Sequence, residues 1–97
     1  MTSVLLADDH ALVRSGFAMV LSVEDDLEVV GQAADGRQAV ERVAEGGVDV
    51  VLMDVQMPGM DGLEATRRIV AAGGAKVIIL TTFDREAVSY THLRAHE

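Results

Sequence analysis

The feature that most constrains this chain is the alternation of short apolar runs with longer segments whose apolar residues recur at helical spacing. Each run is almost continuously apolar, which is typical of a strand buried on both faces of a parallel sheet. The segments between the runs predict helices, so strands and helices alternate along the chain. We predict four strands, at residues 3–7, 28–34, 48–53 and 76–82.

Capping residues indicate where the predicted helices begin. The first helix begins at Ala11, and the Asp9 carboxylate can accept hydrogen bonds from its free N–H groups. In the other two helices a carboxylate is followed three residues later by Gln or Glu, which is the spacing of a capping box. These pairs are Asp35 with Gln38 and Asp61 with Glu64, and glycines at 73 and 74 end the third helix.

Strands and helices in this order predict an α/β fold: a doubly wound parallel sheet with helices on both faces, joined by right-handed crossovers. Helical spacing predicts which apolar side chains of the helices face the core. They are Leu12, Val13, Phe17, Val20 and Leu21 in the first helix, Ala39, Val40 and Val43 in the second, and Leu63, Ile69 and Val70 in the third.

Polar residues follow three of the four predicted strands. Asp8 and Asp9 follow the first strand, Asp54 follows the third, and Thr81 lies at the end of the fourth. Function collects at the carboxyl ends of the strands in such sheets. Carboxylates that meet there repel one another unless a hard cation lies among them, and oxygen ligands favour Mg²⁺. An Asp beside Mg²⁺ can attack phosphorus, so we predict Asp54 as a nucleophile and the Asp pair as metal ligands.

Each of these residues also has a plainer interpretation. An Asp pair after a strand is most often a helix cap in a solvated loop, and an Asp at a strand end is usually a turn residue. Thr81 is first of all a β-branched strand former, and His10 is more readily a surface residue than a ligand. The metal-site hypothesis depends on all of these residues meeting at one edge.

Composition excludes several other classes of protein. The 97 residues suffice for one compact domain, and a net charge of -8 with a pI near 4.6 disfavours a nucleic-acid-binding surface. The chain has no cysteine, which excludes disulfides, thiolate metal sites and thiol catalysis. Neither a signal peptide nor an apolar run long enough to span a bilayer is found, so we expect a cytoplasmic protein without membrane contact.

Three segments resemble bacterial response-regulator receiver domains of two-component systems. They are residues 6–10 (Leu-Ala-Asp-Asp-His), 52–62 (Leu-Met-Asp-Val-Gln-Met-Pro-Gly-Met-Asp-Gly) and 80–83 (Leu-Thr-Thr-Phe), the second being the most specific. The resemblance implies a flavodoxin-like fold with five parallel strands in the order 2-1-3-4-5. Residues 1–87 match this pattern through its fourth strand, so the chain would hold four of the five strands, in the order 2-1-3-4.

The resemblance also implies roles for particular residues. Asp54 would be the phosphoacceptor, Asp9 would bind Mg²⁺ directly and Asp8 largely through water. The backbone carbonyl of Gln56 would be a further ligand. Thr81 matches the hydroxyl residue that turns toward the phosphoryl group after transfer and moves the loop behind it. Such a domain is a signalling module rather than an enzyme, because it catalyses only its own phosphorylation and slow dephosphorylation.

The residues of the first and last of these segments resemble the NarL/FixJ type of regulator. This implies a sensor histidine kinase as the phosphoryl donor. It also implies a LuxR-type helix-turn-helix domain beyond a linker, so any contact with DNA would be made through that C-terminal domain. A homodimer of the complete, phosphorylated protein is compatible with this type.

The C-terminal part of the chain departs from the family pattern. The fifth strand and its phosphate-pairing Lys are missing, and Lys76, the chain's one lysine, begins the fourth strand at the edge opposite the acidic residues. Residues 88–97 resemble the translation of a sequencing adapter, so we interpret residues 1–87 as a truncated receiver and the rest as a non-native tail. We expect such a fragment to be unstable, because its fourth strand is an apolar edge.

Two other functions remain open at this stage. The first is a Mg²⁺-dependent phosphohydrolase with an Asp nucleophile, similar to haloacid-dehalogenase-like enzymes. Those enzymes have a second Asp two residues after the nucleophile, where this chain has Gln56. The second is a receiver-like binding module that never takes phosphate, but such modules usually lose one of the acidic residues.

Overall fold

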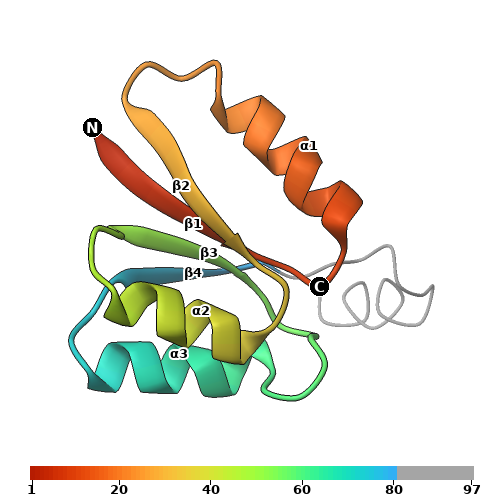
Figure 1. The fold of residues 1–97 in the computed structure, drawn as a ribbon, viewed down its shortest axis with the longest axis vertical. Coiled ribbons are helices and arrows are strands. Elements are labelled where there is room, and N and C mark those ends of the chain that lie inside the picture. Colours follow the sequence, from red (N-terminus) through yellow and green to blue (C-terminus); the bar gives the residue numbers. More distant parts are fainter. Residues whose placement is uncertain (81–97) are drawn as a thin grey trace, which may run out of the picture.

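The computed structural model of the protein describes residues 1–80. Within them, four parallel strands form one sheet in the order β2-β1-β3-β4 (Figure 1). The strands are β1 (Thr2–Ala7), β2 (Leu27–Ala33), β3 (Val50–Asp54) and β4 (Lys76–Leu80). The helices are α1 (Ala11–Leu21), α2 (Gly36–Ala44) and α3 (Gly62–Ala71). The predicted α/β class and the strand order 2-1-3-4 are confirmed.

The register of the sheet brings the ends of β1 and β3 to the same level. Ala7 pairs with Met53, so the next residues along these strands are Asp8 and Asp54. On the other side of β1, Ala7 pairs with Ala33 of β2. Parallel strands that end together place their following residues at one edge of the sheet, as the sequence predicts.

The helices cover the two faces of the sheet unequally. Helices α2 and α3 lie side by side on one face, and α1 lies on the other (Figure 1). The core forms between the sheet and the α2–α3 pair, where the inward side of the central strands is fully buried. Its buried members are Leu5, Ala7, Ala33, Ala39, Val51, Met53, Met57, Ala65 and Ile69.

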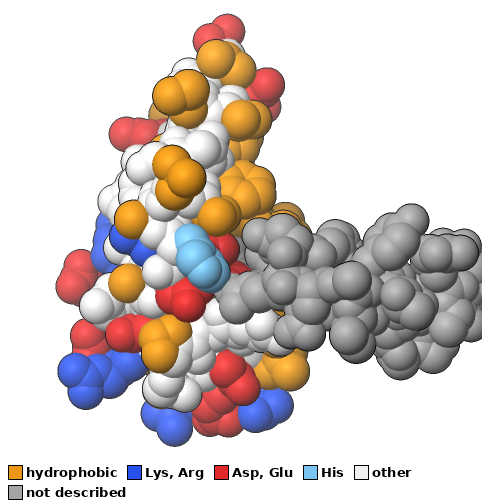
Figure 2. All heavy atoms as spheres, turned by 90° about the vertical axis from the view of Figure 1, so that its right-hand side faces the viewer, with side chains coloured by type: hydrophobic (Ala, Val, Ile, Leu, Met, Phe, Trp, Pro, Cys, Tyr) orange, Lys and Arg blue, Asp and Glu red, His pale blue; other side chains and the backbone are white. Residues whose placement is uncertain are grey.

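The predicted core face of α1 is only partly buried in the described part of the molecule, where Val13 and Leu21 are half-buried. No residue of α1 is buried, and Leu12, Phe17 and Val20 are 85%, 38% and 64% exposed. Within residues 1–80 the helix contacts β1 and β2 but no other helix, so no second helix covers its exposed apolar residues there. Figure 2 shows apolar side chains at the surface over this upper part of the molecule.

The predicted burial is wrong for two residues of α3, whereas β4 is the apolar edge strand that the sequence predicts. Ile69 is buried in the core, but Leu63 and Val70 are 47% and 61% exposed. The buried face of α3 consists of Gly62, Ala65 and Ile69. Strand β4 is the edge strand of the described sheet, and its Ile78 and Ile79 are 51% and 37% exposed.

The capping boxes are confirmed in part. In α2 the Asp35 carboxylate accepts from Gln38 N at 2.8 Å, and the Gln38 side chain accepts from Ala34 N at the same distance. In α1 the N-cap residue is His10, which makes no capping bond with its side chain. The N-cap position is thus His10 rather than Asp9, and the Asp9 carboxylate lies 2.9 Å from His10 Nδ1.

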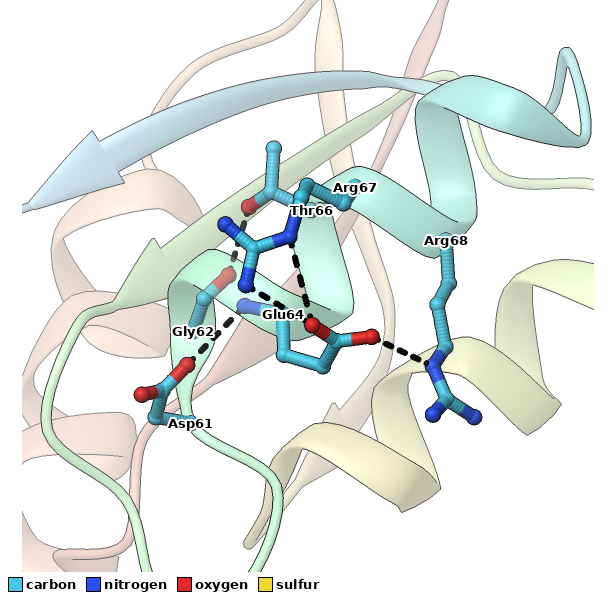
Figure 3. A network of polar contacts seen from close by, with 6 residues as sticks. All are labelled: Asp61, Gly62, Glu64, Thr66, Arg67 and Arg68. Atoms are coloured by element: carbon cyan, nitrogen blue, oxygen red, sulfur yellow. Dashed lines mark hydrogen bonds and ion pairs between the residues drawn. The ribbon is translucent and has the colours of Figure 1, made fainter.

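Glu64 is at the centre of a network of polar contacts at the start of α3 (Figure 3). Its backbone N–H donates to the Asp61 carboxylate at 2.9 Å, as in a capping box. The Glu64 side chain does not return to the N-cap residue. It accepts from Arg67 Nη2 at 2.7 Å and from Arg68 Nε at 2.9 Å. These two arginines, Arg68 most strongly, lower the pKa of the Glu64 carboxyl below its ordinary value.

We expect Glu64→Gln to lower the free energy of unfolding slightly at neutral pH and not at all in acid. A carboxyl whose pKa is lowered by folding stabilises the folded state above its unfolded pKa. That contribution is lost as the pH falls through the folded pKa, and it is small because the network is exposed. Urea unfolding at a series of pH values checks this, with Glu41→Gln on α2 as the control. A difference between wild type and Glu64→Gln that grows in acid would contradict it.

Candidate functional site

Four chemistry-bearing side chains meet at the carboxyl edge of the sheet. Asp8, Asp9 and His10 form the loop after β1, and Asp54 is the last residue of β3. One ligand atom from each of the four lies within 4.8 Å of all the others. Figure 2 views this edge and shows acidic side chains beside a histidine. The acidic residues that the sequence predicts to converge do so.

The acidic residues of this cluster differ in burial. Asp54 is 1% exposed, and the side chains of Asp8 and Asp9 are 9% and 27% exposed. Hydrogen bonds fix the first of the two loop carboxylates, because Asp8 Oδ1 accepts from the backbone N of His10 at 2.8 Å. Asp8 N donates to the Ala33 carbonyl at 3.0 Å, so β1 remains paired with β2 up to the loop. The loop carboxylates are thus held on a rigid strand end.

The backbone around Asp54 is supported by the start of α3. Gly62 N donates to the Val55 carbonyl at 2.8 Å, directly beyond the strand. A Cβ atom on Gly62 would lie 2.0 Å from the Asp54 carbonyl oxygen, so the helix approaches the strand more closely than any other residue permits. Asp54 is therefore positioned by a tight junction between β3 and α3.

His10 is the residue of the cluster that the sequence analysis undervalues. Its side chain is 49% exposed, which fits a surface residue, but its Nδ1 lies 3.2 Å from Asp8 Oδ1 and 2.9 Å from Asp9 Oδ1. Its position directly after two aspartates is the signal that could have indicated this contact. The imidazole caps the acidic cluster on its solvent side.

The acidic cluster suits a hard divalent cation. Three carboxylates, two of them buried, are brought together at a cost in mutual repulsion that a bound cation would offset. Carboxylate oxygens are the ligands that Mg²⁺ prefers, and this ion usually takes few protein ligands and keeps several waters. A Mg²⁺ site of this kind does not need the imidazole of His10 as a ligand. The residues present therefore fit Mg²⁺.

Comparison with known proteins shows the family. A model of the response regulator receiver domain matches residues 4–96 of the chain. The chain belongs to the response regulator receiver family. This membership favours the receiver interpretation over the phosphohydrolase alternative. It agrees with the resemblance that the three sequence segments indicate.

Proteins similar to this receiver domain include an oxygen regulatory protein and the response regulator NarL. The chain is 46% identical over 93 residues to the oxygen regulatory protein NreC of Staphylococcus carnosus, covering 94% of the chain and 43% of NreC. The chain thus spans less than half the length of this relative. The signal receiver domain of NarL from Mycobacterium tuberculosis is 34% identical, with a TM-score of 0.79 over 96% of this chain and 76% of that one.

A third similar protein has a metal and a phosphate mimic bound in its solved structure. The response regulator TrrA from Thermotoga maritima, in complex with Mg²⁺ and beryllium fluoride, is 29% identical to this receiver domain, with a TM-score of 0.78. The match covers 91% of this chain and 76% of TrrA. None of the helices in residues 1–80 of the receiver domain has the length and apolar character of a membrane span.

Of the remaining predicted residues, two lie within the described part of the molecule, Gln56 and Lys76. Gln56 is exposed in the loop after β3, two residues beyond Asp54. Lys76 begins β4 at the opposite edge of the sheet, as predicted for this receiver domain. Thr81 and residues 88–97 lie outside the described residues. Their roles, and the domain boundary at residue 87, stay predictions.

Proposed function

We propose that this receiver domain accepts a phosphoryl group on Asp54 from a sensor histidine kinase, with Mg²⁺ bound beside it. The observation that carries the proposal is the convergence of Asp8 and Asp9 on the buried Asp54, with their ligand atoms within 4.8 Å. A nucleophilic carboxylate next to metal-binding carboxylates is the arrangement that phosphoryl transfer to Asp requires. The likeness to TrrA in complex with Mg²⁺ and beryllium fluoride supports it.

In the proposed reaction, an Asp54 carboxylate oxygen attacks the phosphorus of the donor. A new bond forms between that oxygen and phosphorus, and the bond from phosphorus to the donor breaks. The leaving group departs with the electron pair. It is the imidazole of the kinase histidine, or acetate where acetyl phosphate is the donor. The product is an aspartyl phosphate, and water later hydrolyses it slowly. This is modification of the protein itself, so the domain is a signalling module and does not turn over a small substrate.

We assign the metal ligands as Asp8, Asp9, Asp54 and the backbone carbonyl of Gln56. When bound, Mg²⁺ would offset the negative charge that accumulates between the acceptor and the phosphoryl oxygens. The chain's own contribution is to hold Asp54 at the rigid end of β3, 1% exposed, with Asp8 and Asp9 facing it from β1. Burial excludes bulk water and strengthens the electrostatic interactions there.

The signal is proposed to leave the site through Thr81, the hydroxyl residue that would turn toward the phosphoryl group. In the whole protein the output would be a LuxR-type helix-turn-helix domain that binds DNA, by analogy with a DNA-binding response regulator of the LuxR family from Staphylococcus aureus, which is 28% identical to this chain. We further propose a cytoplasmic protein that forms a homodimer once phosphorylated. Residues 1–87 would be the receiver and residues 88–97 a non-native tail.

The test is phosphorylation of the purified protein by radiolabelled acetyl phosphate. With Mg²⁺ present, we expect a covalent label that hydroxylamine removes, because an acyl phosphate is sensitive to this nucleophile. Chelation of the metal with EDTA is expected to slow labelling by at least about a hundredfold, since the cation contributes several kcal/mol to such transfers. Added Mg²⁺ should restore the rate. Labelling that ignores EDTA, or turnover without any protein label, would contradict the proposal.

A further inference from the structure

Arg14 in α1 links the acidic loop to the neighbouring strand. Its Nη1 donates to the Asp8 backbone carbonyl at 2.6 Å, and its Nε donates to the Gln32 side-chain oxygen of β2 at 3.0 Å. We propose that Arg14 is a positioning residue for the Mg²⁺ site, acting through the Asp8–Asp9 peptide. This inference rests on the proposed function, because it assumes that Asp8 and Asp9 hold the metal.

Both the N–H and the carbonyl of Asp8 are hydrogen-bonded, and both hydrogen bonds connect the Asp8 backbone to β2, one directly and one through Arg14. Asp8 N donates to the carbonyl of Ala33, and the Asp8 carbonyl accepts from Arg14, which Gln32 in turn fixes. The carbonyl of one residue and the N–H of the next lie in a single rigid plane. Fixing the Asp8 carbonyl therefore fixes the direction of the Asp9 amide, and with it the point from which the Asp9 side chain leaves the backbone.

A positioning role matters most for Asp9, the more exposed of the two loop carboxylates. The Asp9 side chain is 27% exposed and its Oδ1 lies 2.9 Å from His10 Nδ1, so the direction of the Asp9 backbone contributes to the position of this carboxylate. Groups that orient metal ligands from outside the coordination sphere contribute to affinity by keeping those ligands in the productive geometry. Arg14 supplies this support to the main chain of the loop.

A purely structural role is the competing explanation. No residue of α1 is buried, so the Arg14–Gln32 contact could serve only to attach this helix to the sheet. In that case loss of Arg14 would lower the melting temperature and leave Mg²⁺ affinity unchanged. A purely electrostatic role makes the opposite prediction to positioning, because removing a positive charge near the carboxylates would raise Mg²⁺ affinity. The direction of the change in affinity therefore separates the three explanations.

The experiment is a calorimetric titration of Mg²⁺ into the metal-free protein, well below its melting temperature. We expect Arg14→Gln to weaken Mg²⁺ binding about tenfold, as for other residues that support metal ligands. Arg14→Lys is expected to weaken it similarly, because one ammonium cannot reproduce the two separate N–H donors of the guanidinium fork. The control is Arg37→Gln, since Arg37 is 78% exposed on α2 and its ion pair is with Glu41. We expect wild-type affinity for this control.

A second variant and a second measurement keep the test decisive. If Arg14→Gln does not fold, Gln32→Ala removes one anchor of the guanidinium and should weaken Mg²⁺ binding about threefold. The backbone amide resonance of Asp9 should also move in the metal-free Arg14 variants and stay in place in Arg37→Gln. Wild-type or tighter Mg²⁺ binding by both the Arg14 and the Gln32 variants would overturn the positioning role alone. Absence of Mg²⁺ binding by the wild type would overturn the proposed function, and this inference with it.

Discussion

Asp54→Asn is expected to abolish covalent labelling of the protein by acetyl phosphate, to below about one hundredth of the wild-type rate. The change replaces the nucleophilic carboxylate by a neutral amide. It preserves the shape of a residue that is 1% exposed. Labelling is measured with radiolabelled donor and Mg²⁺ over a time course. Labelling of the Asp54→Asn variant at the wild-type rate would show that Asp54 is not the acceptor.

The matched control for this prediction is Asp49→Asn, at the opposite end of the same strand. The Asp49 carboxylate accepts from Ser3 N at 2.8 Å, close to the start of β3 and away from the acidic cluster. It should be labelled at the wild-type rate. A second readout comes from repulsion, because three carboxylates meet in the metal-free site and Asp54→Asn removes one negative charge. The melting temperature of this variant without Mg²⁺ should therefore equal or exceed that of the wild type.

Gly62→Ala should destabilise the protein by about 3 kcal/mol, the upper range for overpacked positions, and disrupt phosphorylation with it. The added Cβ would lie 2.0 Å from the Asp54 carbonyl oxygen and 2.9 Å from its carbonyl carbon. These are backbone atoms, so a side-chain rotation cannot relieve the clash. One way to relieve the clash is for α3 to move away from β3, which breaks the hydrogen bond from Gly62 N to the Val55 carbonyl. The other is a shift of the strand end that carries Asp54.

The control for Gly62→Ala is the same substitution at Gly16, in the middle of α1. A Cβ at Gly16 would meet no atom within 4 Å, and alanine is the better helix former by about 0.5–1 kcal/mol. Gly16→Ala should therefore raise the free energy of unfolding and leave labelling unchanged. Urea unfolding measures both variants. A Gly62→Ala variant as stable as the wild type would refute the close approach of α3 to the Asp54 backbone.

The acidic site could be predicted from the sequence because it depends on topology alone. Once short apolar runs alternate with helices, the sheet is parallel, and residues that follow its strands must meet at one edge. Asp8, Asp9 and Asp54 come together for this reason. The placement of Lys76 at the opposite edge follows from the same rule, since it begins its strand.

The supporting contacts of the site could not be predicted in this way. His10 contacts the acidic side chains, and Arg14 donates to the Asp8 carbonyl. Both contacts depend on the path of one loop and on side-chain rotamers. The helical spacing in α1 correctly indicated a helix but not what the helix packs against. Spacing identifies an apolar face, whereas burial depends on which other elements reach it.

The sequence by itself determined the order of strands and helices, the edge at which the carboxylates gather and the family to which the chain belongs. These properties follow from local patterns, from the geometry of parallel sheets and from three short segments. The tertiary structure decided the contact of His10 with the acidic pair, the anchoring of the Asp8 carbonyl by Arg14 and the close approach of Gly62 to Asp54. Each of these depends on how separate elements pack in three dimensions, and pattern along the chain does not specify such distances.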